Sequence, residues 1–459
     1  MSKSKSGANE KNNMKWWQLS LFGVGCTIGT GFFLGSGLAI KMAGPAILLA
    51  FLIAALGTYF VYDALSKMTS KEPLKGGFRS YAKKAYGRWA GFSSGWVYWS
   101  SEVLIMGSQL TALSIFSRFW FPNIPLWVFT GIYAVLGLTI ILIGVKVLNR
   151  LENILAILKI SAITMFIVIA LLAIFGVIEG DRPIKFPNSA SEIIPHGTTG
   201  LWSAVIFAFY AFGGIEILGL MATKLKDPNE APKAGKVMLF TLMIIYVLSI
   251  GLAVMMVSWN QFNTKESTFV VALNAYHLSF VPHFFNATLI IAGFSTMTAS
   301  LYGVTSVLET LGEEKDAPAC FAKKGKLKVP LWTLVITMLG ITASIISALV
   351  LPDQIYEWVT TAAGLMLLYN WLFILASSRK ILELTGKEKV MYSIGALFIL
   401  IAVSGTLFHA TSRPGFFISL AFIGVIGIIT LILNFKWKKE NKKEKEKSKS
   451  SMLKPWPTA

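Results

Sequence analysis

Long apolar runs are the feature that most constrains how this chain can fold. Of its 459 residues, 54% are hydrophobic and only 14% are charged, whereas a soluble domain carries about 25% charged residues. The charges cluster between apolar runs that are each close to the roughly 20 residues a helix needs to cross a bilayer. Runs such as LFTLMIIYVLSIGLAVMMV do not alternate polar and apolar residues, as the strands of a membrane barrel would. The sequence therefore predicts an all-α polytopic membrane protein.

We expect twelve transmembrane helices. They lie near residues 17–43, 45–68, 91–118, 124–146, 152–178, 200–222, 235–258, 281–309, 330–351, 355–378, 390–410 and 414–435. The remaining parts are a cytoplasmic N-terminal segment, 1–16, and a basic cytoplasmic tail, 436–459. We expect the tail to be a solvated, disordered end that also favours anionic lipid head groups.

The basic residues indicate how the chain is oriented. The net charge is +19, but 35 of the 42 Lys and Arg residues fall in one set of alternate loops and the two termini. This distribution is typical of the cytoplasmic side of a membrane protein, and it argues against a nucleic-acid partner. We therefore predict an integral plasma membrane protein with both termini in the cytoplasm.

Glycine interrupts two of the expected spans. In GVGCTIGTGFFLGSG, Gly23 to Gly37, six of fifteen residues are glycine, although glycine costs about 1 kcal/mol against alanine inside a helix. The sixth span, LWSAVIFAFYAFGGIEILGLMA, contains Gly213-Gly214 followed by Glu216. Close helix packing is the alternative explanation for a single glycine-rich span. Two interrupted spans at corresponding positions instead favour helices that unwind in the membrane.

These interruptions divide the chain into two halves. Each starts a group of five spans, 17–178 and 200–378, and two further spans follow at 390–435. An odd number of spans per group inverts the second group relative to the first, which is the arrangement of inverted-repeat transporters. Half-helix N-termini favour carboxylates and half-helix C-termini favour cations. An amino acid would suit such a site, with its carboxylate on the amides around Thr30 and Gly31 and its ammonium on the carbonyls around Phe212 and Gly213.

Ionisable residues inside a membrane are candidates for function. Glu102, Glu216 and Lys159 lie deep in their spans, whereas Glu152 starts the fifth span and is expected to act at a helix N-terminus. Lys159 could reach the interface or face the interior of the bundle, where it could exchange a proton in each transport cycle and replace a sodium ion. The four histidines show no metal-ligand spacing. We expect no metal, no cofactor and no enzyme activity.

Several motifs resemble the amino acid–polyamine–organocation (APC) superfamily. GVGCTIGTGFFLGSG is similar to the first-span signature of its amino acid permeases, AFGGIEILG to their sixth-span break, and DPNEAPKA to the segment after it. The resemblance implies a 5+5 inverted repeat with discontinuous helices 1 and 6, and two extra C-terminal helices. It also implies an amino acid held by main-chain groups around Ile28, Gly29, Thr30, Gly31, Phe212, Gly213 and Ile215. By the same resemblance Tyr210 and Glu216 match gating residues, and Lys159 matches the lysine of proton-coupled members.

The side chain of the transported amino acid is the least determined feature. Candidate pocket residues are Cys26, Phe33, Glu102, Val103, Ile105, Met106, Ile217, Ser295 and Thr298. Most are apolar, which favours a neutral, aliphatic substrate, while Glu102 would support a basic one.

We therefore expect secondary active import of an amino acid by proton symport with alternating access. A basic amino acid permease and an amino acid exchanger are alternatives within the same class. A transporter-like amino acid receptor is an alternative of another class. The partners we expect are an amino acid, a proton and the lipid bilayer, and the sequence indicates no oligomeric state.

Overall fold

The structure is a computed structural model that describes residues 14–143, 145–178, 189–263, 266–276, 278, 280–324, 329–350 and 355–452. Helices account for the regular structure of these residues. The first half contains α1 (Trp16–Thr27), α2 (Thr30–Phe33), α3 (Gly35–Ala43), η1 (Gly44–Ala46), α4 (Ile47–Lys71), α5 (Phe78–Tyr86), α6 (Arg88–Arg118), α7 (Leu126–Ile143), α8 (Val145–Ile174) and α9 (Ala190–Ile193). The second half contains α10 (Gly197–Tyr210), α11 (Ile215–Met221), η2 (Ala222–Lys224), η3 (Pro228–Glu230), α12 (Ala231–Met256), η4 (Trp259–Gln261), α13 (Thr268–Leu273), α14 (Val281–Glu313), η5 (Ala319–Ala322), α15 (Leu331–Val350), α16 (Ile355–Ile381), α17 (Gly386–Gly405) and α18 (Arg413–Met452).

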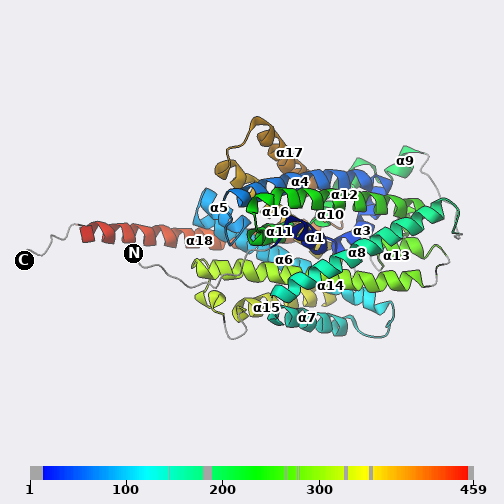
Figure 1. Ribbon diagram of the computed structural model, residues 1–459, viewed down its shortest axis with the longest axis horizontal. Helices are drawn as coiled ribbons and strands as arrows, with labels where there is room; N and C mark the ends of the chain where they lie inside the picture. Colours follow the sequence, from blue (N-terminus) through cyan, green and yellow to red (C-terminus); the bar gives the residue numbers. More distant parts are fainter. Residues whose placement is uncertain are drawn as a thin grey trace, which may run out of the picture.

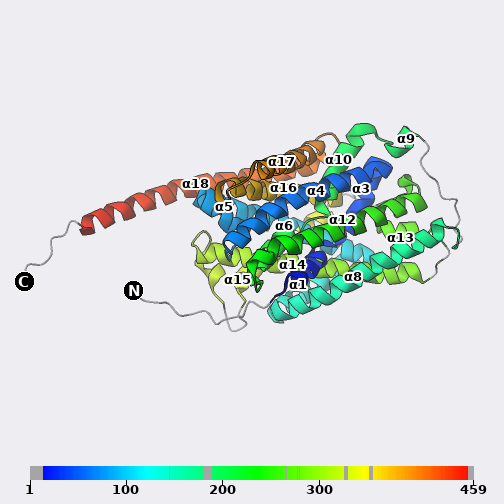
Figure 2. The same cartoon turned by 45° about the horizontal axis from the view of Figure 1, so that its top comes forward.

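The long helices run side by side along the longest axis of the molecule (Figures 1 and 2). In the described residues, nine helical stretches are long and apolar enough to cross a membrane, and a shorter apolar stretch covers Leu331–Ile346. One of the nine, Thr30–Lys71, joins α2, α3 and α4. The all-α prediction is therefore confirmed. The count of twelve spans and the inverted repeat stay predictions.

The C-terminal helix differs from the expectation for the tail. We predict disorder from residue 436 onward, but α18 continues as one helix to Met452, and both views show it leaving the bundle (Figures 1 and 2). The reason lies in composition, because residues 436–452 are rich in lysine and glutamate and contain neither glycine nor proline to end the helix. Residues 453–459 lie outside the described residues.

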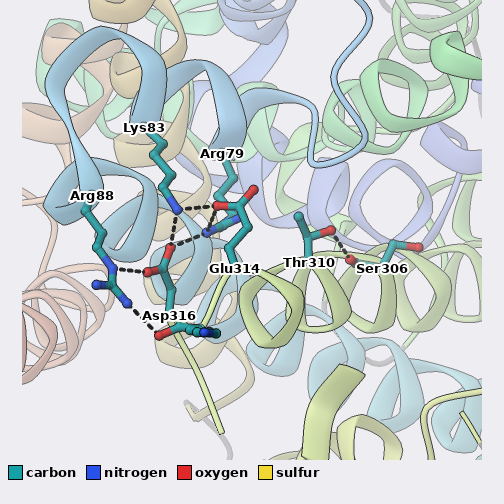
Figure 3. Close-up of polar contacts among 8 residues, drawn as sticks. Arg79, Lys83, Arg88, Ser306, Thr310, Glu314 and Asp316 are labelled. Atoms are coloured by element: carbon teal, nitrogen blue, oxygen red, sulfur yellow. Dashed lines mark hydrogen bonds and ion pairs between the residues drawn. The ribbon is translucent and has the colours of Figure 1, made fainter. Parts of the chain in front are cut away.

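An ion-pair cluster joins α5 and the start of α6 to the segment that follows α14 (Figure 3). Arg79 Nη2 lies 2.7 Å from Asp316 Oδ2, and both side chains are fully buried. Arg88 Nε lies 2.5 Å from Asp316 Oδ1, and Lys83 Nζ lies 2.5 Å from Glu314 Oε2. Burial raises the pKa of Glu314, but hydrogen bonds from Lys83 and Arg79 lower it more, so its pKa lies below the usual range. The cluster therefore connects α5 and α6 to the segment after α14 at one end of the bundle.

Candidate functional site

The first helix is interrupted where the glycines predict. Helix α1 ends at Thr27, Ile28 and Gly29 are extended, and α2 starts at Thr30. A Cβ on Gly29 would lie 2.6 Å from Thr296 Oγ1 on α14, so a larger residue would have to displace its neighbour. Among the described residues, nothing accepts a hydrogen bond from the main-chain N–H groups of Thr30 and Gly31. These two donors are therefore free for a ligand.

A second interruption separates α10 from α11. Gly214 has φ +118°, a backbone conformation that residues with a Cβ rarely adopt. In the described part of the chain, the carbonyls of Phe212 and Gly213 accept no hydrogen bond. A Cβ on Gly214 would lie 3.2 Å from the carbonyl oxygen of Cys26 in α1. The two interruptions therefore lie against each other, and Figure 1 shows α1 and α11 together near the middle of the bundle.

A cavity lies between the two interruptions. Its cavity volume is about 30 Å³. Its lining residues are Cys26, Thr27, Gly29, Thr30, Gly31, Glu102, Ile105, Gln109, Tyr210, Gly213, Gly214, Ile217, Thr296 and Ser300. They come from α1, α2, α6, α10, α11, α14 and the two breaks. The elements that the sequence singles out therefore meet at one cavity.

The structure brings together only part of the predicted site. Of the predicted residues, the cavity lining includes Cys26, Gly29, Thr30, Gly31, Glu102, Ile105, Tyr210, Gly213 and Ile217. The residues that fall outside the lining are Ile28, Phe33, Val103, Met106, Lys159, Phe212, Ile215, Glu216, Ser295 and Thr298. Phe33, for example, packs against the rings of Phe32 and Phe269.

Five lining residues were not among the predicted site residues, although Gly214 was recognised as part of the second interruption. They are Thr27, Gln109, Gly214, Thr296 and Ser300. A periodicity signal was available for three of them, because Glu102, Ile105 and Gln109 have the spacing of one helix face, as do Thr296 and Ser300. The consequence is a wall more polar than the mostly apolar one we predict.

The polar wall contains two acceptors without partners. Glu102 is buried, and its Oε2 has no hydrogen-bond partner among the described residues. The same holds for Gln109 Oε1, although Gln109 Nε2 donates to Thr296 Oγ1 at 3.2 Å. Tyr210 lies close to the first interruption, because a Cβ on Gly31 would lie 2.9 Å from its ring. Its hydroxyl lies 3.0 Å from Ser108 Oγ.

Lys159 faces the interior of the bundle. It is fully buried on α8, and its Nζ donates to the carbonyl of Gly25 at 2.5 Å and to Ser295 Oγ at 2.9 Å. Gly25 belongs to the last turn of α1, where free carbonyls carry partial negative charge. The lysine is therefore a charged cap on the interrupted helix, and Ser295 contacts this lysine instead of the cavity.

Glu152 is not at a helix N-terminus, so that expectation was wrong. Helix α8 begins at Val145, which places Glu152 about two turns inside the helix. Its carboxylate is fully buried and accepts a hydrogen bond from Ser295 Oγ at 2.6 Å. The boundary error arose because the charged residues before Glu152 read as a loop, although they continue the helix.

Glu216 forms hydrogen bonds at the second interruption. It is the second residue of α11, fully buried, and its Oε2 accepts the Gly214 N–H at 3.1 Å. Its Oε1 accepts a hydrogen bond from the indole of Trp371 on α16, a residue that sequence reasoning did not single out. Across the described ranges, no group of three or more His, Cys, Asp or Glu side chains could hold a metal ion.

Comparisons with known proteins show which sequences this chain is similar to. Residues 18–448 match the model of a family described as amino acid permease. The chain is 54% identical to an uncharacterized transporter, YcgH, of Bacillus subtilis, over 95% of this chain and 98% of the relative. It is 28% identical to the aromatic amino acid transport protein AroP of Escherichia coli K12, over 95% and 97% of the two chains. It is 27% identical to the gamma-aminobutyric acid permease of B. subtilis, over 97% of both chains.

Proposed function

Because this chain belongs to the amino acid permease family, we propose that it imports a neutral amino acid together with a proton. Membership of this family makes it a multi-pass membrane transporter of amino acids and not an enzyme. The observation that carries the proposal is the pair of interruptions that meet at one cavity with main-chain groups of opposite polarity.

The main-chain groups suit the two ends of an amino acid. The free N–H groups of Thr30 and Gly31 would bind the carboxylate, and the free carbonyls of Phe212 and Gly213 would bind the ammonium. Ile28, Gly29 and Ile215 complete the main-chain segments of the site. An unpaired main-chain group in hydrocarbon costs several kcal/mol, so the substrate would stabilise the two breaks when it binds.

Lys159 supports the proton-coupled part of the proposal. A cation on the carbonyl of Gly25 would hold α1 in place, and its loss on deprotonation would free the end of that helix. Alternating access would then link protonation to the position of α1. Glu216 and Tyr210, which contact the two interruptions, are the gating residues that we propose.

Two observations bear on the side chain of the substrate. Cys26, Ile105 and Ile217 offer an apolar part of the cavity, which suits a neutral, aliphatic amino acid. The unpartnered Oε2 of Glu102 favours a basic amino acid as the second candidate.

We further propose that the protein lies in the plasma membrane with both termini in the cytoplasm. We also propose twelve spans, arranged as a 5+5 inverted repeat followed by two more helices.

Uptake by purified protein in proteoliposomes tests the proposal. Labelled leucine, phenylalanine, gamma-aminobutyrate and lysine should be offered with and without an inward proton gradient, and the membrane potential should be clamped. We expect leucine to accumulate only with the gradient. Lys159→Gln should abolish this accumulation. Uptake that ignores the proton gradient would refute symport, and saturable binding without uptake of any of the four would favour a receptor.

A further inference from the structure

Glu152 is a buried acid that the proposed function does not use. It precedes Lys159 by seven residues on α8, which is close to two full turns, so both side chains lie on the same face of the helix. Both are fully buried. A buried charge is costly unless it is paired and hydrogen-bonded, so the position of this acid beside a buried lysine calls for an explanation.

Ser295 on α14 connects the two groups. Lys159 Nζ donates to Ser295 Oγ at 2.9 Å, and the same Oγ donates to Glu152 Oε2 at 2.6 Å. Each donor therefore points to the next group along the chain Lys159, Ser295, Glu152. Thr298 Oγ1, one turn later on α14, lies 3.3 Å from the other carboxylate oxygen. These hydrogen bonds therefore form a donor-to-acceptor chain that runs from Lys159 through Ser295 to Glu152.

The surroundings contain few other groups that could take the proton. Of the described residues, Glu152 and the buried thiol of Cys26 on α1 are the titratable groups that interact with Lys159. Helix α14 contributes the hydroxyls of Ser295 and Thr298. Within the described ranges, α7 and α12, which also pack on α8, contribute no titratable group to Lys159. No hydrogen bond links Cys26 to Lys159 among these residues. The carboxylate is thus the acceptor that the hydrogen bonds reach.

We propose that Glu152 receives the proton that Lys159 releases in each cycle, through the hydroxyl of Ser295. In this step the Lys159 ammonium gives a proton to Ser295 Oγ as the Ser295 hydroxyl proton passes to Glu152 Oε2. A neutral amine, an intact serine and a carboxylic acid remain, so no atom is gained or lost. The proton moves toward the N-terminal end of α8, which the charge distribution predicts to be cytoplasmic. This inference rests on the proposed proton symport.

The relay would couple the proton to the substrate site. When Lys159 is neutral, its hydrogen bond to the Gly25 carbonyl loses its charge assistance and weakens. Gly25 lies in the last turn of α1, directly before the interruption that lines the cavity. Release of the proton to Glu152 would therefore loosen the helix end that holds the substrate.

Three variants in proteoliposomes test the relay. Glu152→Gln keeps an oxygen that accepts from Ser295 but cannot take the proton, Ser295→Ala removes the hydroxyl between the two charged groups, and Ser295→Thr keeps a hydroxyl as the matched control. For each variant, labelled leucine uptake is measured with an inward gradient of about one pH unit, which corresponds to about tenfold accumulation by one-proton symport. Exchange of labelled for unlabelled leucine at equal pH is measured in parallel, because exchange needs no net proton release.

We expect Glu152→Gln and Ser295→Ala to lose the tenfold accumulation and to keep leucine exchange, and Ser295→Thr to keep both. Retained exchange shows that these variants fold and bind substrate. Full accumulation by either Glu152→Gln or Ser295→Ala, with wild-type accumulation intact, would overturn the relay and leave the symport standing. Loss of exchange together with accumulation in Glu152→Gln would also overturn it, since the acid would then be needed for the fold. A wild-type protein without gradient-driven uptake would instead refute the symport itself.

Discussion

The two interruptions expose helix ends of opposite polarity, and a buried ionisable side chain forms a hydrogen bond with each end. At the end of α1 the exposed helix terminus carries partial negative charge, and the ammonium of Lys159 binds the Gly25 carbonyl there. At the start of α11 the exposed terminus carries partial positive charge, and a carboxyl oxygen of Glu216 accepts a hydrogen bond from the Gly214 N–H. The side chain beside each break therefore matches the polarity of the exposed helix end: a donor lies at the carbonyl end and an acceptor lies at the N–H end.

The glycines at the two interruptions serve different purposes. Gly29 is extended, at φ −149°, which any residue adopts, and it is needed because Thr296 approaches it closely. Gly214 has φ +118°, so its backbone conformation itself excludes a Cβ, and it also approaches the main chain of α1. A side-chain neighbour can be trimmed, whereas a main-chain conformation cannot. The two sites should therefore respond differently to the same substitution.

Gly214→Ala should have the largest effect. The left-handed backbone strain costs on the order of 1–3 kcal/mol, and the new methyl would lie 3.2 Å from the carbonyl oxygen of Cys26. We expect almost complete loss of leucine uptake and a lower melting temperature of the purified protein. Thr27→Ala, which trims the neighbouring side chain, should not restore either. Recovery of uptake in the Gly214→Ala, Thr27→Ala double variant would show that side-chain crowding, and not the backbone conformation, requires a glycine at position 214.

Gly29→Ala should be almost as harmful alone but reversible. Its methyl would lie 2.6 Å from Thr296 Oγ1, an overpacking that costs about 1–3 kcal/mol. Thr296→Ala removes the hydroxyl and methyl that the new Cβ would meet at 2.6 and 2.8 Å, and it leaves the Cβ of residue 296 at 3.1 Å. We expect the double variant to regain part of the stability lost by Gly29→Ala, as measured by thermal unfolding. Equal stability of the single and double variants would remove the distinction between the two glycines.

Trp371→Phe should have the smallest of the three effects. It removes one hydrogen bond to Glu216 and keeps an aromatic ring, at a cost of about 1–3 kcal/mol for the buried acceptor. We expect slower leucine uptake with little change in binding, because the main-chain site is untouched. Trp202→Phe is the matched control. Trp202 lies on α10, away from the second interruption, and its indole donates to the carbonyl of Ile401 on α17 at 2.7 Å. Similar losses of uptake in both variants would argue against a specific role of Trp371 at the second interruption.

The local features of the site could be predicted from sequence, and the contacts across the bundle could not. Glycine content predicted both interruptions, and Lys159 stood out as a charged residue in an apolar run. Each of these features can be recognised within a single span. Trp371 is one of 14 tryptophans in the chain, and nothing in its own span marks it as the partner of Glu216. The position of Glu152 was predicted wrongly because α8 begins at Val145, seven residues earlier than expected. Glu152 therefore lies inside the helix and not at its N-terminus.

The amino-acid sequence was enough to predict that the chain is helical, that its helices are apolar enough to span a membrane, and where two of them are interrupted. Those properties follow from hydropathy and helix propensity, which act over a few neighbouring residues. Only the tertiary structure decided that Ser295 bridges Lys159 and Glu152, and that Gln109, Thr296 and Ser300 form a polar wall of the cavity. These pairings join residues more than a hundred positions apart, and only the packing of whole helices brings such residues into contact.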